Sequence, residues 1–84
     1  MRTNSILIVD DDEKLCALLR SYFEQERFMV YVAYDGMTAL HTLRTQKPQI
    51  MLLDLMMPGI DGFEVCRRIR QFSDIPIIFL SAKD

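Results

Sequence analysis

Two short apolar runs, each closed by an acidic residue, constrain the fold of this chain more than any other feature. Ile6–Val9 is followed by Asp10, Asp11 and Asp12, and Ile50–Leu53 is followed by Asp54. Neither run alternates with polar residues, which is typical of a strand that is buried on both faces. Strands of this kind belong to parallel sheets covered by helices. The repeated layout therefore predicts two buried strands whose carboxyl ends carry carboxylates.

Segments with helical periodicity separate the strands. The residues from Glu13 to Gln25 carry apolar side chains at helical spacing, and Asp12 stands where an N-cap belongs. A second helix is predicted after Asp35-Gly36 and ends before Pro48. The other predicted elements are a strand over residues 28–33, a helix containing Phe63, Cys66 and Ile69, and a fourth, buried strand over 75–80 with Pro76 at its entry.

This alternation of strands and helices predicts an α/β fold with a doubly wound parallel sheet. If the third strand returns past the first, right-handed crossovers place the first helix on one face of the sheet and the second and third on the other. Cys16 and Cys66 would then lie on opposite faces, and their spacing suggests neither a disulfide nor a metal site. With 84 residues, the chain forms one domain at most.

Composition excludes several classes of function. The formal net charge of −2 leaves no basic face for nucleic-acid phosphates, so this segment is not expected to bind DNA itself. No apolar run is long enough to span a membrane, and the first residues do not resemble a signal peptide. We therefore expect a cytoplasmic protein. His41 has no acid or second histidine at ligand spacing and is assigned no role.

The acids predict a metal site. In an open parallel sheet, ligands bind beyond the carboxyl ends of the strands where the strand order reverses, so Asp10, Asp11 and Asp54 converge if their strands are neighbours. Like charges in contact raise the pKa of at least one carboxyl unless a cation binds. Oxygen ligands without His or Cys favour Mg²⁺ over Zn²⁺ and suggest phosphoryl chemistry. Asp54 is placed as the carboxylate nucleophile, and the Ser81 hydroxyl could donate to the same phosphoryl group.

The segments Ile6 to Asp11, Leu52 to Gly62 and Pro76 to Ala82 resemble, in order, the motifs of a bacterial response-regulator receiver domain, whose fold is flavodoxin-like. The resemblance implies Asp54 as the phosphoacceptor, Asp11 as a direct metal ligand, Asp10 as a ligand often acting through water, the backbone carbonyl of Met56 as a third ligand and Ser81 as the switch hydroxyl. It also implies Mg²⁺, a histidine kinase as partner, strand order 2-1-3-4-5, and transcription control through a winged-helix DNA-binding domain.

The chain departs from the family pattern at its end. Family members continue with a helix, a fifth strand that carries a Lys-Pro pair, and a last helix, so residues 1–84 are interpreted as a receiver domain truncated after the fourth strand, with four strands and three helices. Lys83 is in the wrong position for the family's lysine and is not assigned its role. Without that lysine, weak phosphorylation is expected. Arg67, Arg68 and Arg70 are interpreted as a solvated helix face, with kinase docking beside Phe63 as the less favoured alternative.

Two other functions remain open from the sequence. Asp10-Asp11-Asp12 could be the nucleophile-and-acid pair of a haloacid-dehalogenase-like phosphatase, although such a phosphatase has no use for the segment from Asp54 to Gly62. The second alternative is a non-catalytic module that self-associates, because truncation would leave apolar surface on the first helix and an open edge at the fourth strand.

Overall fold

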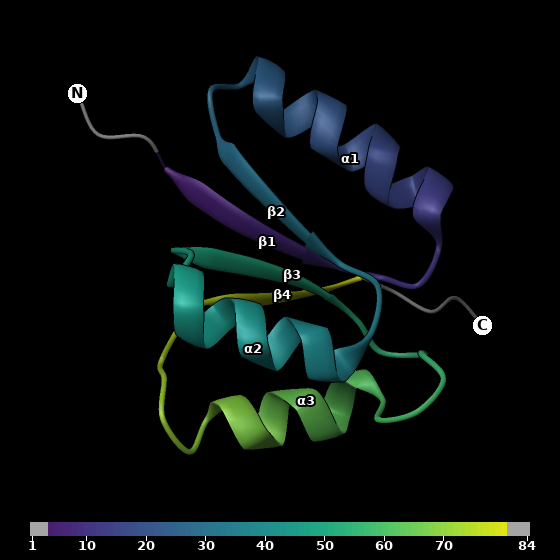
Figure 1. Cartoon of the computed structure of the whole chain (residues 1–84), viewed down its shortest axis with the longest axis vertical. Helices are drawn as coiled ribbons and strands as arrows, with labels where there is room; N and C mark the ends of the chain where they lie inside the picture. The colour runs from purple at the N-terminus through teal and green to yellow at the C-terminus, as the bar shows by residue number, and fades with distance from the viewer. Residues whose placement is uncertain (1–3, 81–84) are drawn as a thin grey trace.

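The computed structural model of the chain describes residues 4–80, which form four strands and three helices around one parallel sheet (Figure 1). The elements follow in the order β1 (Ser5–Val9), α1 (Glu13–Gln25), β2 (Met29–Ala33), α2 (Gly36–Gln46), β3 (Ile50–Asp54), α3 (Gly62–Ile69) and β4 (Ile77–Leu80). The strand order is β2-β1-β3-β4, and every pair is parallel. The predicted doubly wound α/β fold is confirmed.

The helices cover both faces of the sheet, as the crossover rule predicted. α1 packs on one face and α2 and α3 on the other (Figure 1). Alternate residues of β1 supply the two cores: Ile6 and Ile8 lie under α1, whereas Leu7 and Val9 lie under α2 and α3. Cys16 belongs to the α1 core, and Cys66 packs against the other core, so the two cysteines are on opposite faces.

An aspartate begins each helix. The carboxylates of Asp12, Asp35 and Asp61 accept the amide hydrogens of Leu15, Thr38 and Glu64 at 3.1, 2.8 and 2.9 Å. Each bond satisfies one of the amide groups that a helix leaves without an internal partner at its start. Among residues 4–80, no helix combines the length and the apolar character that a membrane crossing requires.

The fourth strand differs from its prediction. β4 starts at Ile77 rather than at residue 75, and β2 starts at Met29 rather than at residue 28. β4 was predicted to be buried, yet Ile78 and Phe79 are 52% and 43% exposed. The reason is position: within the described residues, β4 pairs only with β3 and forms an edge of the sheet. An apolar run alone cannot distinguish such an edge from a central strand.

The apolar stripe of α1 is also only partly covered. Leu15, Leu19 and Phe23 are partly buried, whereas Leu18 and Tyr22 are 68% and 57% exposed. The face of α1 that carries Leu18 and Tyr22 therefore presents apolar surface.

Candidate functional site: a carboxylate cluster at the strand ends

The parallel register brings the acids of β1 and β3 together. Val9 lies beside Leu53 in the pairing of the two strands, so Asp10 and Asp54 come next at the same end of the sheet. The amide of Asp10 donates to the carbonyl of Ala33 at 3.2 Å, which continues the pairing with β2 by one residue. One carboxylate oxygen from each of Asp10, Asp11 and Asp54 lies within 4.8 Å of the other two. The convergence predicted from the sequence is present.

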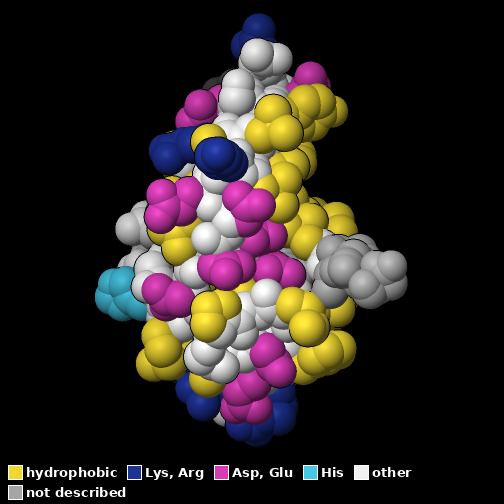
Figure 2. Space-filling view, turned by 90° about the vertical axis from the view of Figure 1, so that its right-hand side faces the viewer, with side chains coloured by type: hydrophobic (Ala, Val, Ile, Leu, Met, Phe, Trp, Pro, Cys, Tyr) yellow, Lys and Arg dark blue, Asp and Glu magenta, His cyan; other side chains and the backbone are white. Residues whose placement is uncertain are grey.

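Figure 2 views the molecule from this end and shows acidic side chains gathered in the middle of the face, with hydrophobic side chains around them. The carboxylate cluster, meaning Asp10, Asp11 and Asp54, combines two buried members with one exposed member. Asp10 and Asp54 are 5% and 8% exposed, and Asp11 is open to solvent. An ion or a phosphoryl group could therefore approach from the solvent side.

Local backbone bonds orient the two buried carboxylates. Oδ1 of Asp10 accepts the amide hydrogen of Asp12 at 2.9 Å, and Oδ1 of Asp54 accepts that of Met56 at 3.1 Å. In both cases an aspartate bonds to the backbone two residues later, the geometry of an Asx turn. The two strand ends thus use the same local device to hold a carboxylate at the edge of the sheet.

The pKa of the Asp10 carboxyl is raised, chiefly because burial removes water from its charged form. Repulsion from Asp54, Asp11 and Asp12 acts in the same direction, and the hydrogen bond from the Asp12 amide opposes the shift. The sequence predicted a raised pKa in this cluster from repulsion. The raised pKa is confirmed for Asp10, but desolvation contributes more to it than repulsion does.

The donor set of the cluster fits a hard divalent cation. All three ligands are carboxylate oxygens, which suit Mg²⁺, and no histidine or cysteine joins them among the described residues. A bound cation would also relieve the repulsion that raises the Asp10 pKa.

Asp12 does not join this cluster, because its carboxylate caps α1 through the amide of Leu15. In the phosphatase alternative, Asp12 has to serve as the acid partner of Asp10. Its use as a helix cap, together with the presence of Asp54 in the site, favours the receiver interpretation.

Several sequence-predicted residues lie elsewhere or cannot be placed. Ser81 and Lys83 lie outside the described residues. The amide of Met56 contacts Asp54, while its side chain is 68% exposed, and the ligand role of its carbonyl stays a prediction. His41 is exposed on α2.

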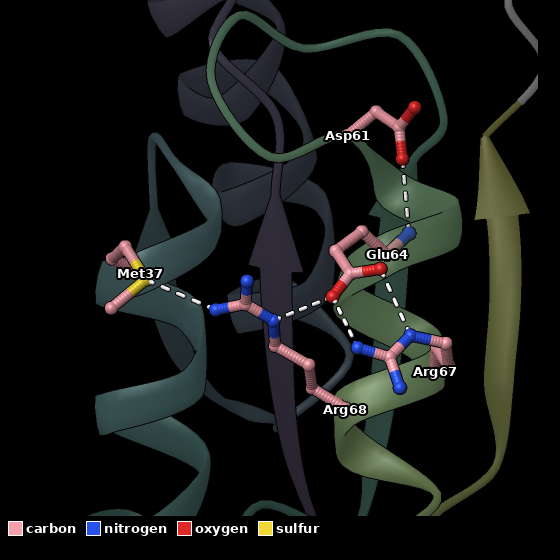
Figure 3. A network of polar contacts seen from close by, with 5 residues as sticks. All are labelled: Met37, Asp61, Glu64, Arg67 and Arg68. Atoms are coloured by element: carbon pink, nitrogen blue, oxygen red, sulfur yellow. Dashed lines mark hydrogen bonds and ion pairs between the residues drawn. The ribbon is translucent and has the colours of Figure 1, made fainter.

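The arginines on α3 are organised by one glutamate (Figure 3). Glu64 accepts hydrogen bonds from Arg67 at 2.6 and 2.9 Å and from Arg68 at 2.7 Å. Arg68 also reaches the sulfur of Met37 on α2 at 3.7 Å. These bonds lower the pKa of Glu64 to about 2. Two of the three arginines are thus surface ion-pair partners, in keeping with the predicted solvated face.

Two residues next to the cluster were not identified as functional from the sequence. The buried thiol of Cys16 donates to the carbonyl of Asp10 at 3.3 Å, and its pKa is raised to about 11 by burial and then by the charge of Asp10, so the thiol keeps its proton. Gly62 lies against the backbone of Asp54 and Leu55, where a Cβ would collide with the carbonyl oxygen of Asp54. The Asp61-Gly62 pair was interpreted only as loop punctuation, and periodicity gives no signal for either contact.

Fold and site together define a flavodoxin-like α/β domain with an acidic cluster at the point where its strand order reverses. The profile of the family described as response regulator receiver domain matches residues 6–84. The chain belongs to this family and is a receiver domain of a two-component response regulator.

Several solved structures share the fold of this chain. The BeF3-activated N-terminal receiver domain of RstA from Klebsiella pneumoniae is 34% identical with a TM-score of 0.91, over 96% of this chain and 69% of that chain. The signal receiver domain of a response regulator from Bermanella marisrubri is 36% identical with a TM-score of 0.87, over 99% of this chain and 72% of that chain. The N-terminal domain of a response regulator receiver protein from Methanoculleus marisnigri is 33% identical with a TM-score of 0.90, over 94% of this chain and 67% of that chain. The chain spans 67–72% of the length of these three relatives.

Proposed function

We propose that this domain accepts a phosphoryl group on Asp54 from a histidine kinase, with Mg²⁺ held in the carboxylate cluster. The observation that carries the proposal is the approach of Asp10, Asp11 and Asp54 to within 4.8 Å at the ends of two adjacent parallel strands. Three carboxylates that converge without a basic partner among residues 4–80 suit a cation and, through it, a phosphate.

Each residue has a separate part. An oxygen of Asp54 attacks phosphorus, a phosphorus–oxygen bond forms, and the phosphorus–nitrogen bond of phosphohistidine breaks with its electron pair leaving on the imidazole. Asp11 and Asp10 would hold the ion together with Asp54 and the carbonyl of Met56. When bound, Mg²⁺ neutralises negative charge on the phosphoryl oxygens. The Ser81 hydroxyl is proposed as a donor to the transferred group.

Asp54→Asn provides the direct test. The 84-residue chain is treated with acetyl phosphate, with and without Mg²⁺, and its intact mass is measured. We expect a minor fraction of the chain to gain one phosphoryl group. This gain requires Mg²⁺, is lost in Asp54→Asn and is removed by hydroxylamine, which cleaves acyl phosphates. Asp35→Asn is the matched control, because Asp35 caps α2 outside the cluster and asparagine caps helices equally well. Equal labelling of Asp54→Asn and the unaltered chain would refute the assignment.

The wider role is proposed on the same basis. A two-component receiver domain takes its phosphoryl group from a histidine kinase, and we propose a cytoplasmic protein that controls transcription through a winged-helix domain outside this segment. Truncation of the domain after the fourth strand, and the absence of direct DNA binding by this segment, stay predictions. A kinase-transfer assay followed by operator binding of a longer chain tests the output.

We further propose that the 84-residue chain self-associates. Ile78 and Phe79 leave apolar surface on both faces of β4, and the ring of Phe79 lies 6.4 Å from that of Phe63, which is 63% exposed. Within residues 4–80, β4 is also an open edge that can pair with another strand. Sedimentation velocity is expected to show dimers or larger species that Phe79→Lys reduces. A monodisperse monomer at micromolar concentration would contradict self-association.

A further inference from the structure

The second feature of interest lies at the other end of the molecule, away from the carboxylate cluster. A pocket that encloses about 340 Å³ opens between the C-terminal end of α2 and the connection from α3 to β4. Figure 1 shows both segments at the end of the sheet opposite the loops that carry the acids. The residues that line the pocket are Leu43, Arg44, Lys47, Pro48, Phe72 and Ser73. The volume lies at the lower end of the range for small-molecule sites, about 300–1,000 Å³.

The pocket combines an apolar floor with two cations. Leu43 and Pro48 are buried, and the ring of Phe72 is 43% exposed. The guanidinium of Arg44 lies 4.6 Å from the centre of that ring, a cation–π contact that holds the charge beside the pocket. Neither Arg44 nor Lys47 takes part in an ion pair among the described residues. The two cations also outweigh the partial negative charge at the C-terminal end of α2.

The backbone at Lys47 is a second, independent observation. Lys47 ends α2 in the left-handed conformation with φ of 51°, a place that Gly or Asn usually occupies. A lysine is strained there because its Cβ crowds the backbone. Strain of this kind is a reason to look for a role of the side chain, and the side chain of Lys47 lines the pocket.

The opposite wall is preformed. Arg70 donates to the carbonyls of Ser73 and Ile75 at 3.2 and 2.8 Å and thereby fixes the connection to β4. The Ser73 hydroxyl oxygen accepts the amide hydrogen of Ile75 at 3.1 Å, so its own hydrogen is left to donate. A ligand at this wall would meet a positioned hydroxyl beside the face of Phe72.

From this arrangement we infer that the pocket binds a small aromatic carboxylate, with its ring on the apolar floor and its carboxylate between Arg44 and Lys47. The apolar floor favours a ring, and two cations without an ion-pair partner in the described part of the chain favour a negative charge over a neutral amide. The volume is sufficient for a ligand of one ring. The inference is independent of phosphorylation, because none of the pocket residues belongs to the carboxylate cluster.

Benzoate is the probe, and backbone amide NMR shifts of the full 84-residue chain are the readout. We expect saturable shifts centred on Leu43, Phe72 and Ser73, and binding of neutral benzamide weaker by about tenfold, the effect of losing one charge-assisted hydrogen bond. Inorganic phosphate tests whether charge alone suffices, and it should bind more weakly than benzoate because it has no ring. Shifts that do not saturate, that centre elsewhere, or that benzamide reproduces equally would overturn the inference.

Lys47→Gly separates ligand binding from folding. Glycine relieves the left-handed strain, so this variant should be at least as resistant to urea as the unaltered chain, while benzoate binds about tenfold more weakly. Lys14→Gln on the exposed surface of α1 is the matched control, which removes a lysine charge away from the pocket and should bind benzoate normally. Unchanged benzoate affinity in Lys47→Gly would rule out the proposed role of this lysine and with it the site.

Discussion

Gly62→Ala should disturb the carboxylate cluster through the backbone, although Gly62 carries no functional group. Gly62 is the first residue of α3, and its amide donates to the carbonyl of Leu55 at 3.1 Å. A Cβ at this position would collide with the carbonyl oxygen of Asp54 and lie 2.7 Å from the Cα of Leu55. Both are main-chain atoms, so no side-chain rotation relieves the contact. Either the end of β3 or the start of α3 has to move.

The size of the effect follows from that contact. Carbon atoms pack best at about 3.5–4.0 Å, so the two backbones have to separate by about 1 Å. Overpacking of this kind costs about 1–3 kcal/mol, and the reduced freedom of the unfolded chain returns about 0.4–1 kcal/mol. We expect a net loss of about 1–2 kcal/mol, from a total of about 4–13 kcal/mol for a chain of 84 residues. With a urea slope near 1 kcal/mol/M, the unfolding midpoint falls by about 1–2 M.

Gly36→Ala is a closely matched control for this measurement. Gly36 is the first residue of α2 and follows the capping Asp35, as Gly62 follows the capping Asp61. Its added Cβ would lie 2.5–2.8 Å from side-chain atoms of Ile60 and Val65, so these side chains have to shift, but side chains can give way more easily than backbone. Urea unfolding followed by circular dichroism, and Mg²⁺ titration by calorimetry, should show the larger losses in Gly62→Ala. Equal midpoints and equal Mg²⁺ affinity for the two variants would refute this reasoning.

Two further predictions concern pH. Because the pKa of Asp10 is raised in the folded state, its charged form destabilises the metal-free protein at neutral pH. As pH falls toward 3.8, protonation of Asp10 increases the free energy of unfolding. Asp10→Asn should therefore raise the free energy of unfolding of the metal-free protein at pH 7 and remove its increase on acidification. The same substitution should weaken Mg²⁺ binding at least tenfold. A variant that unfolds at a lower urea concentration than the unaltered chain at pH 7 would contradict this role of Asp10. The pKa of Glu64 is lowered from 4.5 to about 2, so its contribution is complete above pH 4.5 and is lost as pH falls toward 2. Glu64→Gln should flatten the pH dependence of the free energy of unfolding between pH 4.5 and 2. At high salt the substitution should change the free energy of unfolding little. A pH dependence equal to that of the unaltered chain would disprove this contribution of Glu64.

The fold class and the acids of the carboxylate cluster could be predicted from the sequence, because strong local patterns mark the strands, the helices and the acids at the strand ends. Two uninterrupted apolar runs that end in acids are typical of buried strands in a parallel sheet, and parallel strands place their carboxyl ends at the same edge. The helix start at Asp12 was equally local, since a capping carboxylate binds an amide three residues later, whereas the same role of Asp35 and Asp61 was not predicted. The adjacency of the two strands is not local, and it was expected from the family resemblance.

The features missed from the sequence depend on distances between elements. The exposure of Ile78 follows from the place of β4 at the edge of the sheet, which its composition does not encode. The bond from Cys16 to the Asp10 carbonyl depends on how α1 sits over β1. The left-handed backbone at Lys47 could not be predicted from the sequence because lysine has no preference for that conformation. The pocket beside Lys47 forms only when α2 meets the connection to β4.

Because Gly62 has no side chain, α3 should respond more directly than α2 to a displacement at Asp54. The start of α2 meets the rest of the protein through the side chains of Ile60 and Val65, which can absorb a small displacement. The start of α3 meets the carbonyl of Asp54 with no side chain between them. Asp61 and Glu64 tie the first turn of α3 to its last, through the cap and the bonds to Arg67 and Arg68. A shift at the end of β3 should therefore move α3 as one rigid piece, and Arg68 would carry part of that movement to Met37 on α2.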